Sequence, residues 1–163
     1  MAKRIDVAGI SSVIGTLYPP PFDKRCRACE RKQLGDAAAL TQFSVNLLRL
    51  PPRTWSSQRH WHTAGDEFVY VVCGEVVLVT DEGPEVLRAG DAAGFRAGEK
   101  NGHCLQNRSD VDAMVLEISA RLPNDAVYYS DIDMISPADE TPAIYTRRNG
   151  TPYTDIKRRG PEG

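Results

Sequence analysis

Apolar residues occur along this chain in short runs that polar and glycine-containing segments separate. From about Thr41 the runs are TQFSVNLLRL, EFVYVVCG, EVVLVT, PEVLRAG, DAAGF, HCLQN and AMVLEIS. Each run is short and rich in valine, leucine or phenylalanine, which is typical of β-strands. The separators LPPRTW, TDEGPEV, RAGDAAG and AGEKNG carry the proline and glycine of bends and hairpin turns. This pattern predicts an all-β fold, an antiparallel sandwich or barrel.

The runs also predict how the chain is divided. Residues 41–121 hold all seven runs and form the expected barrel. Residues 1–40, with YPPPFDK, RKQLGD and a short AAAL, are expected to form an extended N-terminal arm with a helical turn. Residues 122–163 are rich in proline, aspartate and tyrosine, and we expect this C-terminal arm to pack on the barrel or on a partner subunit.

Composition and charge narrow the class of partner. The chain has 163 residues, which fits one domain, and its formal net charge is −2. That charge attracts neither nucleic acid nor an anionic membrane, so a small-molecule ligand is expected. The apolar runs are far shorter than the ~20 residues that span a bilayer. The N-terminus lacks a sustained apolar signal core, and this favours a cytoplasmic location.

Four cysteines are too few for a disulfide framework, and we expect reduced thiols at Cys26, Cys29, Cys73 and Cys104. The first two form a C-x-x-C pair. No second C-x-x-C or C-x-x-H follows it, as a zinc site would require. The pair is therefore interpreted as incidental.

The three histidines of the chain all follow turns. His60 and His62 are two positions apart, so on a strand both side chains project to one face while Trp61 points to the other. Glu67 follows a glycine-containing loop and could face the two imidazoles from the next strand. His103 begins the run HCLQN, and a barrel can bring it beside the other three.

Three imidazoles and one carboxylate suit Mn, Fe, Ni, Co or Zn. In a six-coordinate ion they leave two positions for water, dioxygen or substrate. The alternative is that the H-x-H pair lies in the core or on a wet surface without an ion.

The spacing of these residues resembles the two motifs of the cupin superfamily. His60-x-His62-x4-Glu67-x6-Gly74 is similar to the first motif, and Gly90-x5-Arg96-x-Gly98-x4-His103-x3-Asn107 is similar to the second. The resemblance implies a double-stranded β-helix barrel with a divalent transition metal inside. It also implies that His60, His62, Glu67 and His103 bind that metal.

The match departs from the family pattern at three places. Thr54 stands six positions before His60, where a glycine is usual, and Arg96 stands where a proline is usual. Two extra residues separate Gly98 from His103. All four ligand positions survive these changes. The segments GDAAGFRAGEKNGH, YPPPFDK and TRRNGTPY are similar to those of small bacterial single-domain cupins, some of them labelled as sugar-phosphate isomerases.

Strand alternation predicts which neighbours line the cavity. If Glu67 faces inward, Val69 and Val71 share its face. Phe68, Tyr70 and Val72 alternate with these residues and are therefore expected to point outward. The inner wall of this strand is therefore expected to be apolar.

Four other side chains have expected roles. Arg96 could hold a carboxylate or phosphate of a substrate, or be a solvated surface arginine. Asn107 is expected to stabilise a turn and Cys104 to pack in the core. Glu117, a charge in the apolar run MVLEIS, is expected at a sheet edge or on a wet face rather than as a general base.

Three functions fit these features. The first is a metal-dependent isomerase, lyase or dioxygenase acting on a small polar metabolite such as a sugar phosphate or organic acid, in which Glu67 or a bound water moves a proton. The second is a non-catalytic binder or sensor of a sugar or organic acid. The third is a barrel whose metal only stabilises the fold. The exposed strand edges and the resemblance predict a homodimer.

Overall fold

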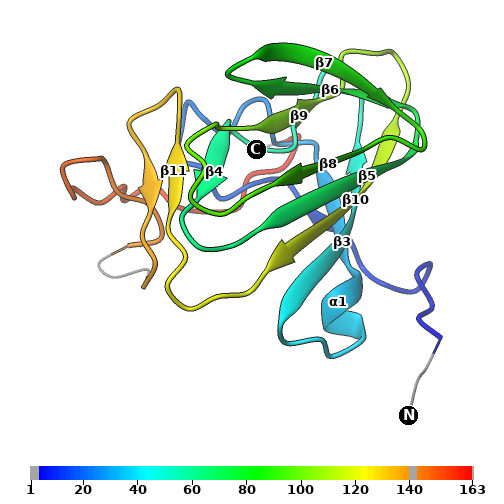
Figure 1. Cartoon of the computed structure of the whole chain (residues 1–163), viewed down its shortest axis with the longest axis horizontal. Helices are drawn as coiled ribbons and strands as arrows, with labels where there is room; N and C mark the ends of the chain where they lie inside the picture. Colours follow the sequence, from blue (N-terminus) through cyan, green and yellow to red (C-terminus); the bar gives the residue numbers. More distant parts are fainter. Residues whose placement is uncertain (1–3, 140–142, 163) are drawn as a thin grey trace.

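Two layers of antiparallel strands pack face to face in the computed structural model of the chain, which describes residues 4–139 and 143–162 (Figure 1). The first layer is a six-stranded sheet. In spatial order its strands are β1 (Val13–Ile14), β2 (Glu30–Gln33), β3 (Phe43–Leu50), β10 (Ala113–Ala120), β5 (Glu67–Cys73) and β8 (Ala92–Phe95).

The second layer consists of two three-stranded sheets. One has the order β12 (Ile135–Ser136), β11 (Val127–Tyr129), β4 (His60–His62), and the other β7 (Gly83–Arg88), β6 (Glu75–Thr80), β9 (Cys104–Gln106). An antiparallel bridge between His60 and His103 joins them. The only helix among the described residues is one turn, α1 (Leu34–Ala37).

The core lies between the layers. Leu48, Val71 and Val115 from the six-stranded sheet are fully buried and belong to the same apolar cluster as Leu78 and Leu105 from the other layer. This shared cluster shows that the two layers close on one another. The prediction of an all-β, double-stranded β-helix barrel is confirmed.

The predicted apolar runs correspond to β3, β5, β6, β7, β8, β9 and β10. Alternation along β5 is as expected, because Val69 and Val71 are buried while Phe68, Tyr70 and Val72 are exposed. The helical turn comes earlier than the AAAL segment, at residues 34–37. Gly74 has a φ of 76°, and a Cβ there would lie 2.7 Å from the Asp112 carbonyl oxygen, so the turn after β5 requires glycine.

Both arms are tied to the strands of the barrel. In the N-terminal arm, β2 pairs with β3, and in the C-terminal arm, β11 pairs with β4. The arms also meet each other, since Thr16 and Arg159 form an antiparallel bridge. The carboxylate of Asp23, which is fully buried, lies 2.7 Å from Arg27 and 3.8 Å from Arg159. The two arms therefore meet each other on one side of the barrel.

The four cysteines are free thiols. Cys26 and Cys29 are buried, at 0% and 1% exposure, and burial raises the pKa of the Cys26 thiol well above its ordinary value. Burial also raises the pKa of Cys104 to about 11. A buried thiol with a raised pKa is a poor nucleophile and a poor metal ligand, which agrees with packing roles for Cys26 and Cys104.

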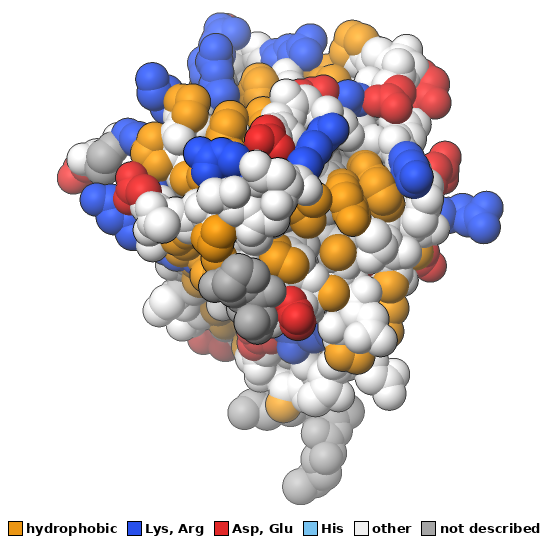
Figure 2. Space-filling model, turned by 90° about the vertical axis from the view of Figure 1, so that its left-hand side faces the viewer, with side chains coloured by type: hydrophobic (Ala, Val, Ile, Leu, Met, Phe, Trp, Pro, Cys, Tyr) orange, Lys and Arg blue, Asp and Glu red, His pale blue; other side chains and the backbone are white. Residues whose placement is uncertain are grey.

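The surface carries charges of both signs. On the face shown in Figure 2, basic and acidic side chains are interspersed with apolar ones, in keeping with a net charge near zero. Among the described residues no helix is both long and apolar enough to cross a membrane.

The outer face of β5 is the surface where we expect a second copy of the chain to pack. Phe68, Tyr70 and Val72 are 41–48% exposed there. The predicted homodimer should give twice the chain mass in light scattering at micromolar concentration. Tyr70→Glu should yield a monomer, because a dimer would bury an unpaired charge. Val86→Glu changes an equally exposed residue (41%) on β7 and should leave the dimer intact. A monomeric wild-type protein would contradict the expectation.

Candidate metal centre

The backbone places two of the histidines opposite one another. The His60 N–H donates to the His103 carbonyl at 3.1 Å, and the His103 N–H donates to the His60 carbonyl at 2.9 Å. Side chains of such a directly opposed pair lie on the same face of a sheet. His62, two residues along β4, shares that face. The three imidazoles therefore point together toward the six-stranded sheet.

The residue before His103 allows this close approach. A Cβ on Gly102 would lie 2.0 Å from the Ser130 hydroxyl oxygen and 3.4 Å from the His60 nitrogen. Only glycine lets the segment before β9 reach β4 and the end of β11. The sequence AGEKNGH thus positions its histidine through the last glycine.

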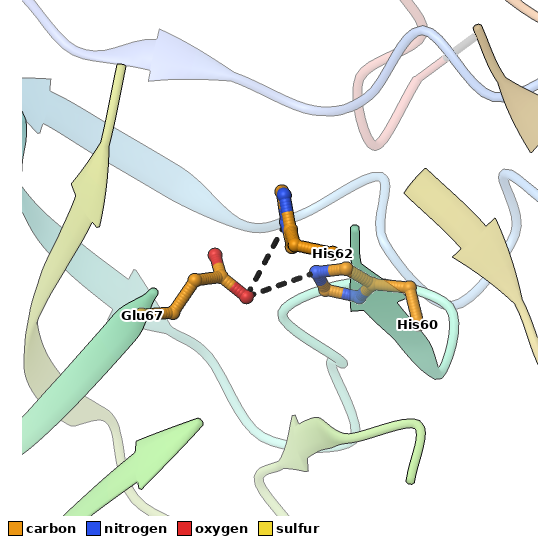
Figure 3. A group of neighbouring side chains, drawn as sticks. All are labelled: His60, His62 and Glu67. Atoms are coloured by element: carbon orange, nitrogen blue, oxygen red, sulfur yellow. Dashed lines mark ion pairs between the residues drawn. The ribbon is translucent and has the colours of Figure 1, made fainter. Parts of the chain in front are cut away.

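Glu67 begins β5 and faces the histidines from the opposite layer (Figure 3). Its Oε2 lies 3.0 Å from Nε2 of His103, 3.4 Å from Nε2 of His62 and 3.5 Å from Nε2 of His60. The ligand atoms of His60, His62 and Glu67 all lie within 4.8 Å of one another, so this group could hold a metal ion. His103 does not belong to that mutually close group, but its Nε2 contacts the Glu67 carboxylate.

Hydrogen bonds at the far side of two rings set their tautomers. Nδ1 of His60 lies 2.9 Å from the Gln58 carbonyl oxygen, which can only accept. Nδ1 of His62 lies 2.5 Å from Oδ2 of Asp125. Both Nδ1 atoms therefore carry the proton, and both Nε2 atoms turn a lone pair toward Glu67.

The convergence of acceptors at the centre calls for a cation. Oε2 of Glu67 is buried and has no hydrogen-bond donor in the described structure. The nitrogens nearest to it from His60 and His62 are lone pairs. A carboxylate oxygen against two imidazole lone pairs is repulsive unless a proton or a metal ion lies between them. A divalent metal fits this donor set of nitrogen and oxygen ligands.

The electrostatics keep Glu67 ionised. Burial alone would raise the pKa of its carboxyl, but the contacts with His103 and His60 outweigh burial and hold the pKa well below its ordinary range. For His60, burial lowers the pKa, yet Glu67 outweighs it and the pKa is raised. For His103, burial dominates and the pKa is lowered. The centre thus holds an ionised carboxylate among the imidazoles, and that carboxylate favours a bound cation.

Phe95 holds the third imidazole in place. Its ring stacks on that of His103 with centroids 3.5 Å apart and planes 2° from parallel. Nδ1 of His103 is buried and has no partner in the described structure. His103 is therefore fixed by stacking and by its backbone, whereas the other two rings are fixed by hydrogen bonds.

Two cavities meet at the candidate ligands. One, of about 380 Å³, is lined by His60, Glu67 and His103 together with residues of both arms and of β2, β3 and β10. The other, of about 280 Å³, is lined by His62, Glu67 and His103 together with residues of β6 and β8 and the loop after β8. The larger volume lies within the range of small-molecule sites.

The other expected site residues lie as follows. Arg96 is exposed and lines the smaller cavity. Asn107 stabilises a turn as predicted, because its amide donates to the carbonyls of Leu50 and Val111 at 2.7 Å. The placement of Glu117 at an edge or on a wet face is wrong. Glu117 lies on β10, an interior strand of the six-stranded sheet. It shares the inward face of that strand with the buried Val115 and lines the larger cavity.

Two site residues were not found from the sequence. Asp125 orients His62, and its other oxygen accepts from the N–H groups of Ala64 and Gly65 at 2.8 and 3.1 Å. Arg31 pairs with Glu117, with N–O distances of 2.8 and 3.1 Å. Both partners come from the arms, more than sixty positions away in sequence. The only sequence signal was the charge of Glu117 within an apolar strand, which implies a buried partner.

Asp125 also has a shifted pKa. Burial alone would raise the pKa of this carboxyl, but the hydrogen bond with His62 outweighs burial and the pKa is lowered. The residue is therefore ionised near neutral pH and can accept a hydrogen bond from the Nδ1–H group of His62. This is the arrangement that many metal-binding histidines share.

Comparison with known proteins agrees with the fold and with the two motifs. The family described as Cupin domain matches residues 46–119. No curated protein sequence matches the chain. A crystal structure of a sugar phosphate isomerase of the cupin superfamily from Silicibacter pomeroyi is 41% identical, with a TM-score of 0.88, over 93% of this chain and 97% of that one.

Two more distant structures share the fold alone. A protein from Acidithiobacillus ferrooxidans, provisionally named a sugar phosphate isomerase, is 23% identical, with a TM-score of 0.70, over 78% of this chain and 81% of that one. A predicted oxalate decarboxylase from Thermotoga maritima is 18% identical, with a TM-score of 0.58, over 74% of this chain and 100% of that one. With near-complete coverage at 41% identity and the family match over both motifs, the chain belongs to the cupin superfamily.

Proposed function

We propose that this protein is a metal-dependent isomerase that acts on a small phosphorylated sugar. The observation that carries the proposal is the convergence of three imidazole nitrogens on an unpartnered carboxylate oxygen at the junction of two cavities. The name of the 41%-identical structure supports the reaction class and the substrate class. One divalent transition metal, Zn, Mn, Fe, Ni or Co, is the proposed cofactor.

His60, His62, Glu67 and His103 would hold the metal, and its chemistry would be to polarise a carbonyl or hydroxyl oxygen of the substrate. Gln58 and Asp125 fix the tautomers of two of these histidines. Phe95 shields the face of His103 from water. The chain thus presents a rigid set of donors with room for a ligand on either side.

The low pKa of Glu67 affects its role. A carboxylate whose pKa lies well below its ordinary range is a weak base and a good ligand. This favours Glu67 as a metal ligand over Glu67 as the group that carries a proton. In the larger cavity the second carboxylate is that of Glu117, which Arg31 keeps in place. A titratable group beside the ligands is what distinguishes a catalyst from a simple binder.

The alternative is a non-catalytic protein that binds a sugar or organic acid. The barrel and the metal would then hold the ligand without changing it. Turnover distinguishes the two, because both functions require the same ligands and the same cavity.

Turnover is tested with metal-loaded protein and a panel of pentose and hexose phosphates. We expect conversion between aldose and ketose forms, followed by NMR. His62→Ala should lose bound metal about tenfold or more and lose conversion with it, while circular dichroism shows an intact fold. Binding of a sugar phosphate without conversion, with every metal tested, would support the alternative instead.

The hydrogen bond between Asp125 and His62 allows a sharper test of the metal site. Asp125→Asn keeps the oxygen that accepts from Ala64 and Gly65, but turns an NH₂ group toward Nδ1 of His62. His62 must then place its proton on Nε2, where the metal should bind. We expect metal affinity to fall about 10- to 100-fold with little loss of stability.

The matched control for this variant is Asp66→Asn. Asp66 also accepts a hydrogen bond from a backbone N–H, that of Ala97 at 2.8 Å. Among the described residues it has no hydrogen bond or ion pair with a histidine. Its metal affinity should equal that of the wild type. Titration with a fluorescent metal indicator gives both values, and unchanged affinity in Asp125→Asn would show that Asp125 does not set the tautomer.

A further inference from the structure

A row of polar side chains crosses the floor of the larger cavity. Glu117 on β10 pairs with Asn46 on β3, and Asn46 pairs with Gln33 on β2. The side chains of such directly opposed residues share one face. All three line the same cavity as Glu67. β3, β10 and β5 lie side by side in the sheet (Figure 1).

This row leads away from the metal ligands. The partner of Glu117 on β5 is Val69, two residues from Glu67, so the two glutamates are diagonal neighbours about 7–8 Å apart. Asn46 and Gln33 follow at successive strand spacings of about 4.8 Å. From Glu67 to Gln33 the floor spans three strand spacings, or roughly 14 Å between backbones. The side chains of Glu67 and Gln33 extend into this span, so the space left between their tips suits a short chain of several carbon atoms rather than a single small ion.

The row is polar without a net charge. Arg31 makes a two-pronged ion pair with Glu117 and also donates to the Ser56 carbonyl at 2.8 Å. Within the described residues, the side-chain amides of Asn46 and Gln33 have no hydrogen-bond partner. An amide offers both donors and acceptors, as does a hydroxyl group. Amides with unused hydrogen-bonding capacity in a cavity are suited to bind the hydroxyl groups of a sugar.

A positive charge from the C-terminal arm also lines the cavity, next to the edge strand β1. Arg158, from the C-terminal arm, is exposed, lines the cavity and donates to the Gly15 carbonyl at 3.1 Å. Gly15 follows β1, which is four strands away from β5 in the sheet. No carboxylate of the described structure pairs with Arg158. An arginine with free donors is well suited to a phosphate.

We propose that Glu117, Asn46 and Gln33 bind the hydroxyl groups of an open-chain sugar phosphate whose carbonyl end lies at the metal ligands and whose phosphate lies at Arg158. This inference rests on the proposed function and adds the orientation of the substrate. It assigns the phosphate to Arg158 in the larger cavity and not to Arg96 in the smaller one. The C-terminal arm thereby becomes part of the substrate site.

The test measures binding by calorimetry, with ribose 5-phosphate, ribose and inorganic phosphate as probes on metal-loaded protein. Asn46→Leu should weaken the binding of ribose 5-phosphate about tenfold, since the loss of one hydrogen bond costs on the order of 1–1.5 kcal/mol. Gln33→Leu, at the exposed end of the row, should act in the same direction and is the safer variant for folding. Arg158→Gln should weaken the binding of ribose 5-phosphate tenfold or more and leave the binding of ribose unchanged.

Arg96→Gln is the matched control, because it removes the same charge from the other cavity. It should leave the affinity of all three probes unchanged. The titrations are repeated after a chelator has removed the metal. The effects of Asn46→Leu and Arg158→Gln on ribose 5-phosphate binding can then be measured even if the protein has no turnover, so failure of this inference and failure of the proposed function can be told apart. Equal losses in Arg96→Gln and Arg158→Gln, wild-type affinity in Asn46→Leu and Gln33→Leu, or no binding of ribose 5-phosphate to the wild type would each overturn it.

Discussion

The reciprocal backbone hydrogen bonds between His60 and His103 are the interaction on which the site depends. They join the two three-stranded sheets into one layer. They also place two imidazoles on the same face, with the third two residues along the strand. The opposite layer supplies Glu67, so the candidate centre lies between the layers and draws on both. The backbone contact that joins the two sheets is therefore also the contact that brings two of the candidate ligands together.

This arrangement brings several hydrogen-bond acceptors together in a partly buried place. Two rings are held with their lone pairs turned inward, by a backbone carbonyl and by Asp125. Glu67 stays ionised among them. Groups that repel one another in the absence of a cation become ligands in its presence, and a metal would stabilise the folded chain by binding to it. The geometry thus explains both why the cluster is tolerated and what it can bind.

Much of the fold was predictable from local pattern. The strand runs, their turns and the inward or outward direction of β5 follow from alternation and from glycine positions, which depend on neighbouring residues only. The H-x-H pair and Glu67 were also found in this way. The meeting with His103 needed the family spacing, because it depends on how the sheets close. Asp125 and Arg31 were missed since each reaches the site from an arm, and no local pattern encodes that contact.

Glu117 illustrates the limit of a single-strand argument. A charge in an apolar strand was expected at an edge, whereas β10 lies inside the sheet and Arg31 from β2 neutralises the carboxylate. The chain ends, which have little apolar patterning, thus complete the cavity that the barrel begins. Differences among related cupins in substrate preference would then be expected in the arms as much as in the barrel.

The most direct test of the account is a crystal structure of the metal-loaded protein with anomalous diffraction measured at the absorption edge of the bound metal. The account predicts one anomalous peak per chain, bonded to Nε2 of His60, His62 and His103 and to the carboxylate of Glu67. An empty centre in which the Glu67 carboxylate accepts a hydrogen bond from a histidine Nε2–H group, or a metal bound elsewhere, would contradict it.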